Sequence, residues 1–149
     1  MIPQSNPPPL AVDGHALVKR LRWVMTAVIL VDIALTLSGQ PPSYWKDPST
    51  VDEGNRLFHQ IMSKGIMVTL LVDLIYVSGS VLLVSILPWR VGLTLLLALV
   101  LGHFFGGSTW LCFRYQLGAT GMVLYGLLLA VVFVIVAFPL GPKNPRADG

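Results

Sequence analysis

The sequence predicts an all-α fold, a polytopic membrane four-helix bundle with a short amphipathic interfacial helix between the first and second spans. Its composition is the first reason: 54% of the 149 residues are hydrophobic, only 11% are charged, and the mean hydropathy is +0.74. A water-soluble domain usually carries about 25% charged residues. The surface of this chain therefore suits lipid better than water, and the lipid bilayer is its first expected partner.

The second reason is the presence of four apolar stretches, each long enough to cross a hydrocarbon core of about 30 Å, which takes about 20 helical residues. Pro88 and Arg90 lie in a short turn between the second and third stretches, so these two spans should be antiparallel neighbours. Asp13 and Gly14 can begin a helix whose amphipathic first turns lead into the first span. The expected spans are residues 22–38, 66–87, 91–112 and 119–140.

The chain divides into a membrane domain and two tails. Residues 1–21 form a Pro-rich N-terminal tail and a basic pre-helix, residues 22–140 the four-span membrane domain, and residues 141–149 a polar C-terminal tail. Such tails are expected to be disordered when nothing binds them. Basic residues do not gather on a face as a nucleic-acid surface requires, so nucleic acid is excluded as a partner.

The distribution of charge also predicts the topology. Four spans place both termini on one side of the membrane. That side holds six Lys and Arg residues, and the other side holds four. The positive-inside rule then puts both termini in the cytoplasm. The expected location is the inner, cytoplasmic membrane of a bacterium.

The loop between the first two spans is expected to contain a helix at about residues 50–64. The run from Thr50 to Glu53 has the pattern of a capping box. Apolar residues then recur at helical spacing, at Leu57, Phe58, Ile61 and Met62. An amphipathic helix on the outer membrane surface, or a lid over the bundle, is predicted.

Polar residues inside the spans are the candidates for function, because a carboxylate at the bilayer centre costs about 3 kcal/mol. Asp32 and Asp73 are the two charged residues well inside the spans, and His103 is the one intramembrane histidine. Each lies about 9 to 11 Å from the same membrane face, given 1.5 Å per helical residue. Helical spacing also gives the second span a polar stripe. The predicted intramembrane cluster is Asp32, Asp73, Tyr76 and His103.

Such a cluster can hold a proton, a metal ion or a small polar ligand, and it can also serve helix packing alone. In the packing interpretation Asp32 bonds Thr36 and Asp73 pairs with Tyr76 or His103. Residues near the outer face can contribute to a site, although Glu53 first serves the capping box and His59 suits an exposed interface. These possible contributors are Glu53, Asn55, His59 and Arg114.

Small residues predict close helix packing at two motifs, Gly102-x-x-x-Gly106 and Gly126-x-x-x-Ala130. The glycines around His103 also leave room for a flat haem or pigment with an axial histidine, although no second histidine lies at a matching depth. No cofactor is therefore assigned. A metal ion, a haem or a pigment at His103 is the alternative, and the sequence does not identify a metal.

Three segments carry a resemblance to known sequences: Leu35 to Trp45, the run Glu53-Gly-Asn55, and Gly102 to Trp110. With them, residues 22–140 resemble a group of small four-span bacterial membrane proteins. The resemblance implies the four-span fold and no reaction.

The first functional hypothesis is a non-catalytic accessory or structural subunit of a larger bacterial membrane complex, with other membrane subunits as partners. The alternative is a proton, ion or small-solute pathway protein that uses the polar cluster in the outer half of the bundle. A membrane-embedded metalloenzyme is the third hypothesis. The sequence identifies no catalytic residue, so a non-enzymatic role is predicted.

Overall fold

A computed structural model describes residues 13–138 of the chain. Four of its helices are long and apolar enough to cross a membrane, and no strand occurs within this range. The protein is therefore helical, with the features of a multi-pass membrane protein. Both predicted tails fall wholly or mostly outside the described residues. The elements are α1 (Gly14–Ser38), η1 (Pro48–Thr50), α2 (Arg56–Met62), α3 (Ile66–Ile86), α4 (Trp89–Thr109), η2 (Trp110–Arg114) and α5 (Gly118–Ala137).

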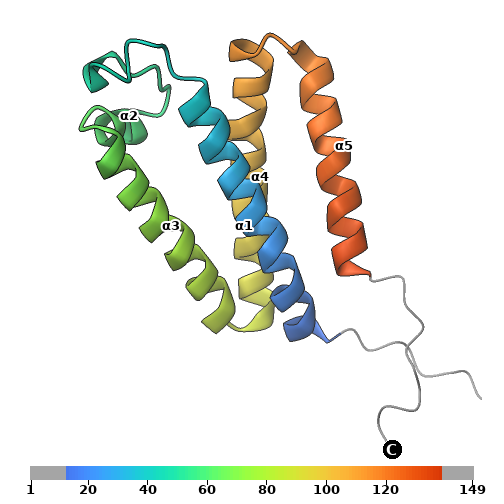
Figure 1. Cartoon of the computed structure of the whole chain (residues 1–149). Helices are drawn as coiled ribbons and strands as arrows, with labels where there is room; N and C mark the ends of the chain where they lie inside the picture. Colours follow the sequence, from blue (N-terminus) through green and yellow to red (C-terminus); the bar gives the residue numbers. More distant parts are fainter. Residues whose placement is uncertain (1–12, 139–149) are drawn as a thin grey trace, which may run out of the picture.

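Helix α1 is the centre of the bundle, because it packs against α3, α4 and α5. It begins, and α5 ends, at the end of the bundle where α3 turns into α4, which we call the terminal end (Figure 1). The loop with η1 and α2 lies at the opposite end, which we call the loop end. The apolar core occupies the terminal half of α1, where its buried positions run from Val18 to Ile29. The part of α1 beyond Ile29 is left for the polar residues.

The first turn of α1 is capped by Asp13, whose carboxylate accepts hydrogen bonds from the backbone N–H groups of His15 and Ala16 at 3.0 and 3.2 Å. A short acidic side chain in this position satisfies N–H groups that have no partner in the helix. The expected start of this helix is thus confirmed. At 25 residues α1 is about 37 Å long, so it exceeds a hydrocarbon core of about 30 Å.

Helices α3 and α4 are joined through Leu87 and Pro88 and pack against each other, as expected for antiparallel neighbours. Gly92 makes this approach possible. A Cβ atom at Gly92 would lie 2.8 Å from the backbone oxygen of Val84, which is too close for any side chain. The α3–α4 pair therefore depends on the absence of a side chain at residue 92.

The predicted helix at residues 50–64 is wrong at its start, and so is the predicted capping box. The Thr50 hydroxyl donates to the carbonyl of Asp47 and closes the short 3-10 turn η1. Helix α2 begins six residues later at Arg56, where the Asn55 side chain accepts from the N–H groups of Leu57 and Phe58. Asn is among the best N-cap residues, and here it replaces the expected threonine.

The loop carries a second local cap at Asp47. Its carboxylate accepts hydrogen bonds from the Ser49 hydroxyl at 2.7 Å and from the Ser49 N–H at 3.0 Å. These bonds stabilise the charged form and lower the pKa of the Asp47 carboxyl below its usual value.

Two buried polar side chains fasten the loop to the bundle. The Gln40 amide donates to the carbonyls of Thr36 and Asp52, each at 3.1 Å, and its oxygen accepts from the Asp52 N–H at 2.9 Å. The Tyr44 hydroxyl, in a residue that is 2% exposed, donates to the carbonyl of Met62 at the end of α2. The loop is therefore held in place over α1 by specific bonds.

The small-residue motifs serve packing only in part. A Cβ atom at Gly106 would lie 2.8 Å from Asp32 Oδ2, and one at Gly126 would lie 3.3 Å from the Phe104 ring. A Cβ atom at Gly102 would meet nothing within 4 Å, and Ala130 is exposed. The close helix contacts expected at Gly102 and Ala130 are thus absent, because Gly102 lines a cavity and Ala130 lies on the exposed face of its helix.

We expect Gly92→Ala to lower the free energy of unfolding by about 1 to 3 kcal/mol, because the added methyl group overlaps the Val84 carbonyl. Unfolding by a denaturing detergent in mixed micelles, followed by circular dichroism, measures this change. The matched control is Gly79→Ala, in which the new methyl group meets nothing within 4 Å. Equal stability of the two variants would contradict the packing described for Gly92.

Candidate functional site

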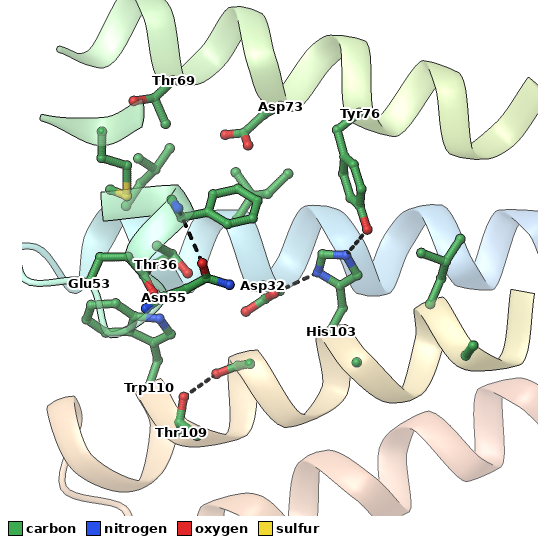
Figure 2. Close-up of a pocket in the computed structure, with 18 residues that line it drawn as sticks. Asp32, Thr36, Glu53, Asn55, Thr69, Asp73, Tyr76, His103, Thr109 and Trp110 are labelled. Carbon is green, nitrogen blue, oxygen red and sulfur yellow. Dashed lines mark hydrogen bonds and ion pairs between the residues drawn. The ribbon is translucent and has the colours of Figure 1, made fainter. Parts of the chain in front are cut away.

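A cavity of about 340 Å³ lies between the loop-end halves of α1, α3 and α4 (Figure 2). Residues from the loop and α2 cover it, including Phe58 and Met62. Its walls combine aliphatic and aromatic side chains with hydroxyl and carboxyl groups. The polar groups that line it come from Asp32, Thr36, Glu53, Asn55, Thr69, Asp73, Tyr76, His103 and Thr109.

Three side chains from three helices form a continuous hydrogen-bonded chain along this cavity. Asp32 Oδ2 on α1 lies 2.7 Å from His103 Nδ1 on α4, and His103 Nε2 lies 2.9 Å from the Tyr76 hydroxyl on α3. The side chains of Asp32 and His103 are each 15% exposed. Because a carboxylate only accepts, Nδ1 carries a proton and donates it to Asp32.

The backbone of α4 allows this contact because Gly106 lies one turn beyond His103. With no Cβ atom there, the Asp32 carboxylate lies directly against the helix surface, which places Oδ2 beside the imidazole. A glycine lowers helix propensity by about 1 kcal/mol, so its presence here has a cost that the contact must offset. Gly106 is therefore part of the architecture of the site.

Asp73 lies on α3, on the same side of the cavity as Tyr76 and across from Asp32 and His103 (Figure 2). The residue is 8% exposed, and its carboxylate makes no hydrogen bond or ion pair to any residue in the range 13–138. The pairing with Tyr76 or His103 that sequence reasoning offered is not formed, because both ring nitrogens of His103 already have other partners. Within residues 13–138, Asp73 is thus a buried carboxylate with no hydrogen-bond or ion-pair partner.

The structure brings together the four residues of the predicted cluster and two of the four predicted loop contributors. Glu53 and Asn55 line the cavity, and Figure 2 shows both at its loop end. Glu53 also accepts a hydrogen bond from the Asn55 N–H at 2.8 Å. His59 and Arg114 do not line this cavity; Arg114 lines a more open hollow next to it, which shares Glu53 and Asn55 as wall residues.

Sequence reasoning missed a second polar group behind Asp32. Asp32 Oδ1, the Tyr125 hydroxyl of α5 and the Ser108 hydroxyl of α4 are buried and have no hydrogen-bond partner within residues 13–138. Gly107 lies against both Tyr125 and Asp32. The available signal was Tyr125 itself, a polar side chain in the middle of an aliphatic span. Asp32 therefore has one oxygen committed to His103 and one still able to accept a proton.

The cluster does not have the donor set of a metal centre. No three His, Cys, Asp or Glu residues in the described part of the chain converge closely enough to hold a metal ion. A haem or pigment at His103 also lacks a free ligand atom, because Nδ1 and Nε2 are bonded to Asp32 and Tyr76. The residues present thus do not fit either alternative.

The chemistry available at this site is proton movement and cation binding. An imidazole between a carboxylate and a phenol can pass a proton from one side to the other when its two nitrogens exchange roles. Thr109 donates its hydroxyl proton to the carbonyl of Gly106 and is not activated as a nucleophile. Three carboxylates that line one cavity, from Asp32, Glu53 and Asp73, attract positive charge.

No known protein family matches the chain, and no curated protein or solved structure matches it.

We expect Gly106→Ala to break the bond between Asp32 and His103, because the new methyl carbon would lie 2.8 and 2.9 Å from the two carboxylate oxygens. Nitrogen NMR of the imidazole measures this directly: the Nδ1–H signal should lose its strongly hydrogen-bonded shift. Overpacking of this kind also costs about 1 to 3 kcal/mol of stability. Gly102→Ala, one turn away in open space, should leave the signal unchanged. An unaltered Nδ1–H in Gly106→Ala would contradict the assigned geometry.

Proposed function

We propose that this membrane protein binds a small organic cation in the cavity at the loop end of its bundle, and that it releases a proton as the cation binds. The observation that carries the proposal is Asp73, a carboxylate that is 8% exposed and has no partner among the described residues. An uncompensated charge is costly in this position, so a proton or a cation must neutralise it. A proton bound to the Asp73 carboxylate excludes the cation, and a bound cation excludes the proton.

The charge balance of the cavity favours a cation. Three carboxylates line it, from Asp32, Asp73 and Glu53, against the single imidazole of His103. No Lys or Arg is among its lining residues. A positively charged ligand therefore gains an attraction that an anion would not find.

The walls of the cavity favour an organic cation over a bare metal ion. A volume of about 340 Å³ is at the small end of ordinary ligand sites. Phe58, Tyr76 and Trp110 contribute aromatic walls, and aromatic faces attract organic ammonium groups. A small amine would find both its charge and its hydrocarbon part accommodated.

The apolar core supports a binding site rather than a continuous channel. Buried aliphatic residues, including Met25, Ile29 and Leu96, fill the terminal half of the bundle. With the termini placed in the cytoplasm, the loop end of the bundle faces the outside of the cell. A ligand would enter and leave on that side.

The accessory-subunit hypothesis stays a prediction. Helix α5 has only two buried residues, Gly121 and Ala137, and its exposed aliphatic face suits lipid as well as a protein neighbour. The metalloenzyme hypothesis lacks a three-ligand metal group in residues 13–138. Cation binding is the hypothesis that accounts for the unpaired carboxylate.

Isothermal titration calorimetry of the full chain in lipid nanodiscs tests the proposal, with ethylammonium chloride as the probe. We expect saturable binding that releases about one proton per cation, seen as a dependence of the heat on the buffer used. Asp73→Asn should weaken binding at least about tenfold, because a bond to a charged group contributes about 1.5 to 3 kcal/mol.

Two controls make the result specific. Asp47→Asn removes a carboxylate of the exposed loop that does not line the cavity, and should bind ethylammonium like the unmodified protein. Ethanol, which matches the probe in size without its charge, should not bind. Saturable binding that survives Asp73→Asn unchanged, or no binding at all, would overturn the proposal.

A further inference from the structure

A second hollow, of about 490 Å³, opens on the face of the bundle between α3 and α4. It borders the polar cavity on the side of the terminal end, and the two share Tyr76 and Leu99 as wall residues. Apart from Tyr76 and Ser80, its lining is aliphatic or glycine: Ile75, Gly79, Leu82, Leu83, Ile86, Leu95 and Leu99. A polar acidic compartment thus adjoins an apolar one across a single tyrosine.

We infer that the ligand is a single-chain amphiphile, with an ammonium head in the polar cavity and an unbranched alkyl tail in the second hollow. This inference rests on the proposed cation site and adds the class of ligand. The head would meet Asp73, and the tail would leave past Tyr76 and Leu99.

The position of Tyr76 supports this division. The Tyr76 hydroxyl is hydrogen-bonded to His103 and belongs to the polar compartment. Tyr76 also lines the apolar hollow. An aromatic side chain with a polar tip suits such a boundary. Beyond Tyr76 the hollow is lined along α3 from Gly79 to Ile86. This stretch is about 10 Å long at 1.5 Å per helical residue.

The hydrophobic contribution of the tail is measurable. A methylene group moved from water to an apolar site is stabilised by about 0.8 kcal/mol, which corresponds to about a fourfold gain in affinity per methylene at full burial. The hollow is open on one side, so we expect a gain of about two- to fourfold. The gain should stop once the chain is longer than the hollow.

Two glycines allow each compartment to be filled separately. A Cβ atom at Gly79, which lines the apolar hollow, meets nothing within 4 Å, and the same holds for Gly102, which lines the polar cavity. The Cβ atom of a leucine at either position therefore fits without overlap, and the rest of its side chain would fill part of that compartment. Ala130→Leu, on the exposed face of α5, adds similar bulk outside both compartments.

The experiment measures the affinity of the full chain in phosphatidylcholine nanodiscs for ethyl-, butyl-, hexyl- and octylammonium chloride. Empty nanodiscs give the free concentration of each probe and the heat of its partition into lipid. We expect affinity to rise with chain length in the unmodified protein and in Ala130→Leu. Gly79→Leu should abolish this rise, and Gly102→Leu should weaken the binding of every probe.

The outcomes separate this inference from the proposed function. If ethylammonium binds but longer chains bind no tighter, or if Gly79→Leu leaves the dependence on chain length intact, the amphiphile inference is wrong and the cation site stands. If no probe binds saturably, both fail. A chain-length dependence that Gly79→Leu removes and Ala130→Leu retains supports the inference.

Discussion

The hydrogen bond from His103 to Asp32 joins the central helix of the bundle to α4, in the half of the molecule that the apolar core does not reach. In hydrocarbon neither partner could remain charged and unpaired without a large cost, so each requires the other. The bond also fixes the imidazole so that its second nitrogen meets Tyr76 on α3. The two hydrogen bonds of one imidazole thus connect three helices around the cavity.

The two halves of the bundle differ in how their helices contact one another. Toward the terminal end, α1 packs through Val, Leu, Ile and Met side chains, and a glycine at residue 92 lets α3 and α4 approach. Toward the loop end the helices leave a space that carboxyl, imidazole and hydroxyl groups line. Gln40 and Tyr44 hold the loop over that space, which gives a structural role to the Leu35–Trp45 segment. The division follows from α1, whose buried apolar positions end before Asp32.

Much of this arrangement could be predicted from sequence, because an apolar stretch of about 20 residues has the length of a helix that crosses the hydrocarbon core. The depth of Asp32, Asp73 and His103 followed from counting along each span. Their pairing did not follow, since depth says nothing about rotation of one helix against another, and the proximity of Gly106 to Asp32 decides that rotation. The loop helix was misplaced because several residues could cap it, and Asn55 rather than Thr50 does so. Tyr125 was missed because the residues that pack against its ring, Phe104 and Gly107, lie on another helix.

The proposed exchange of a proton for a cation at Asp73 has an electrical consequence. If a cation enters from the loop end, as proposed, the proton that it replaces leaves on the same side of the membrane. The exchange therefore moves no net charge through the bilayer, and the transmembrane voltage does no work on it. Occupancy of such a site follows the concentrations of cation and proton on one side of the membrane, whatever the electrical state of the cell.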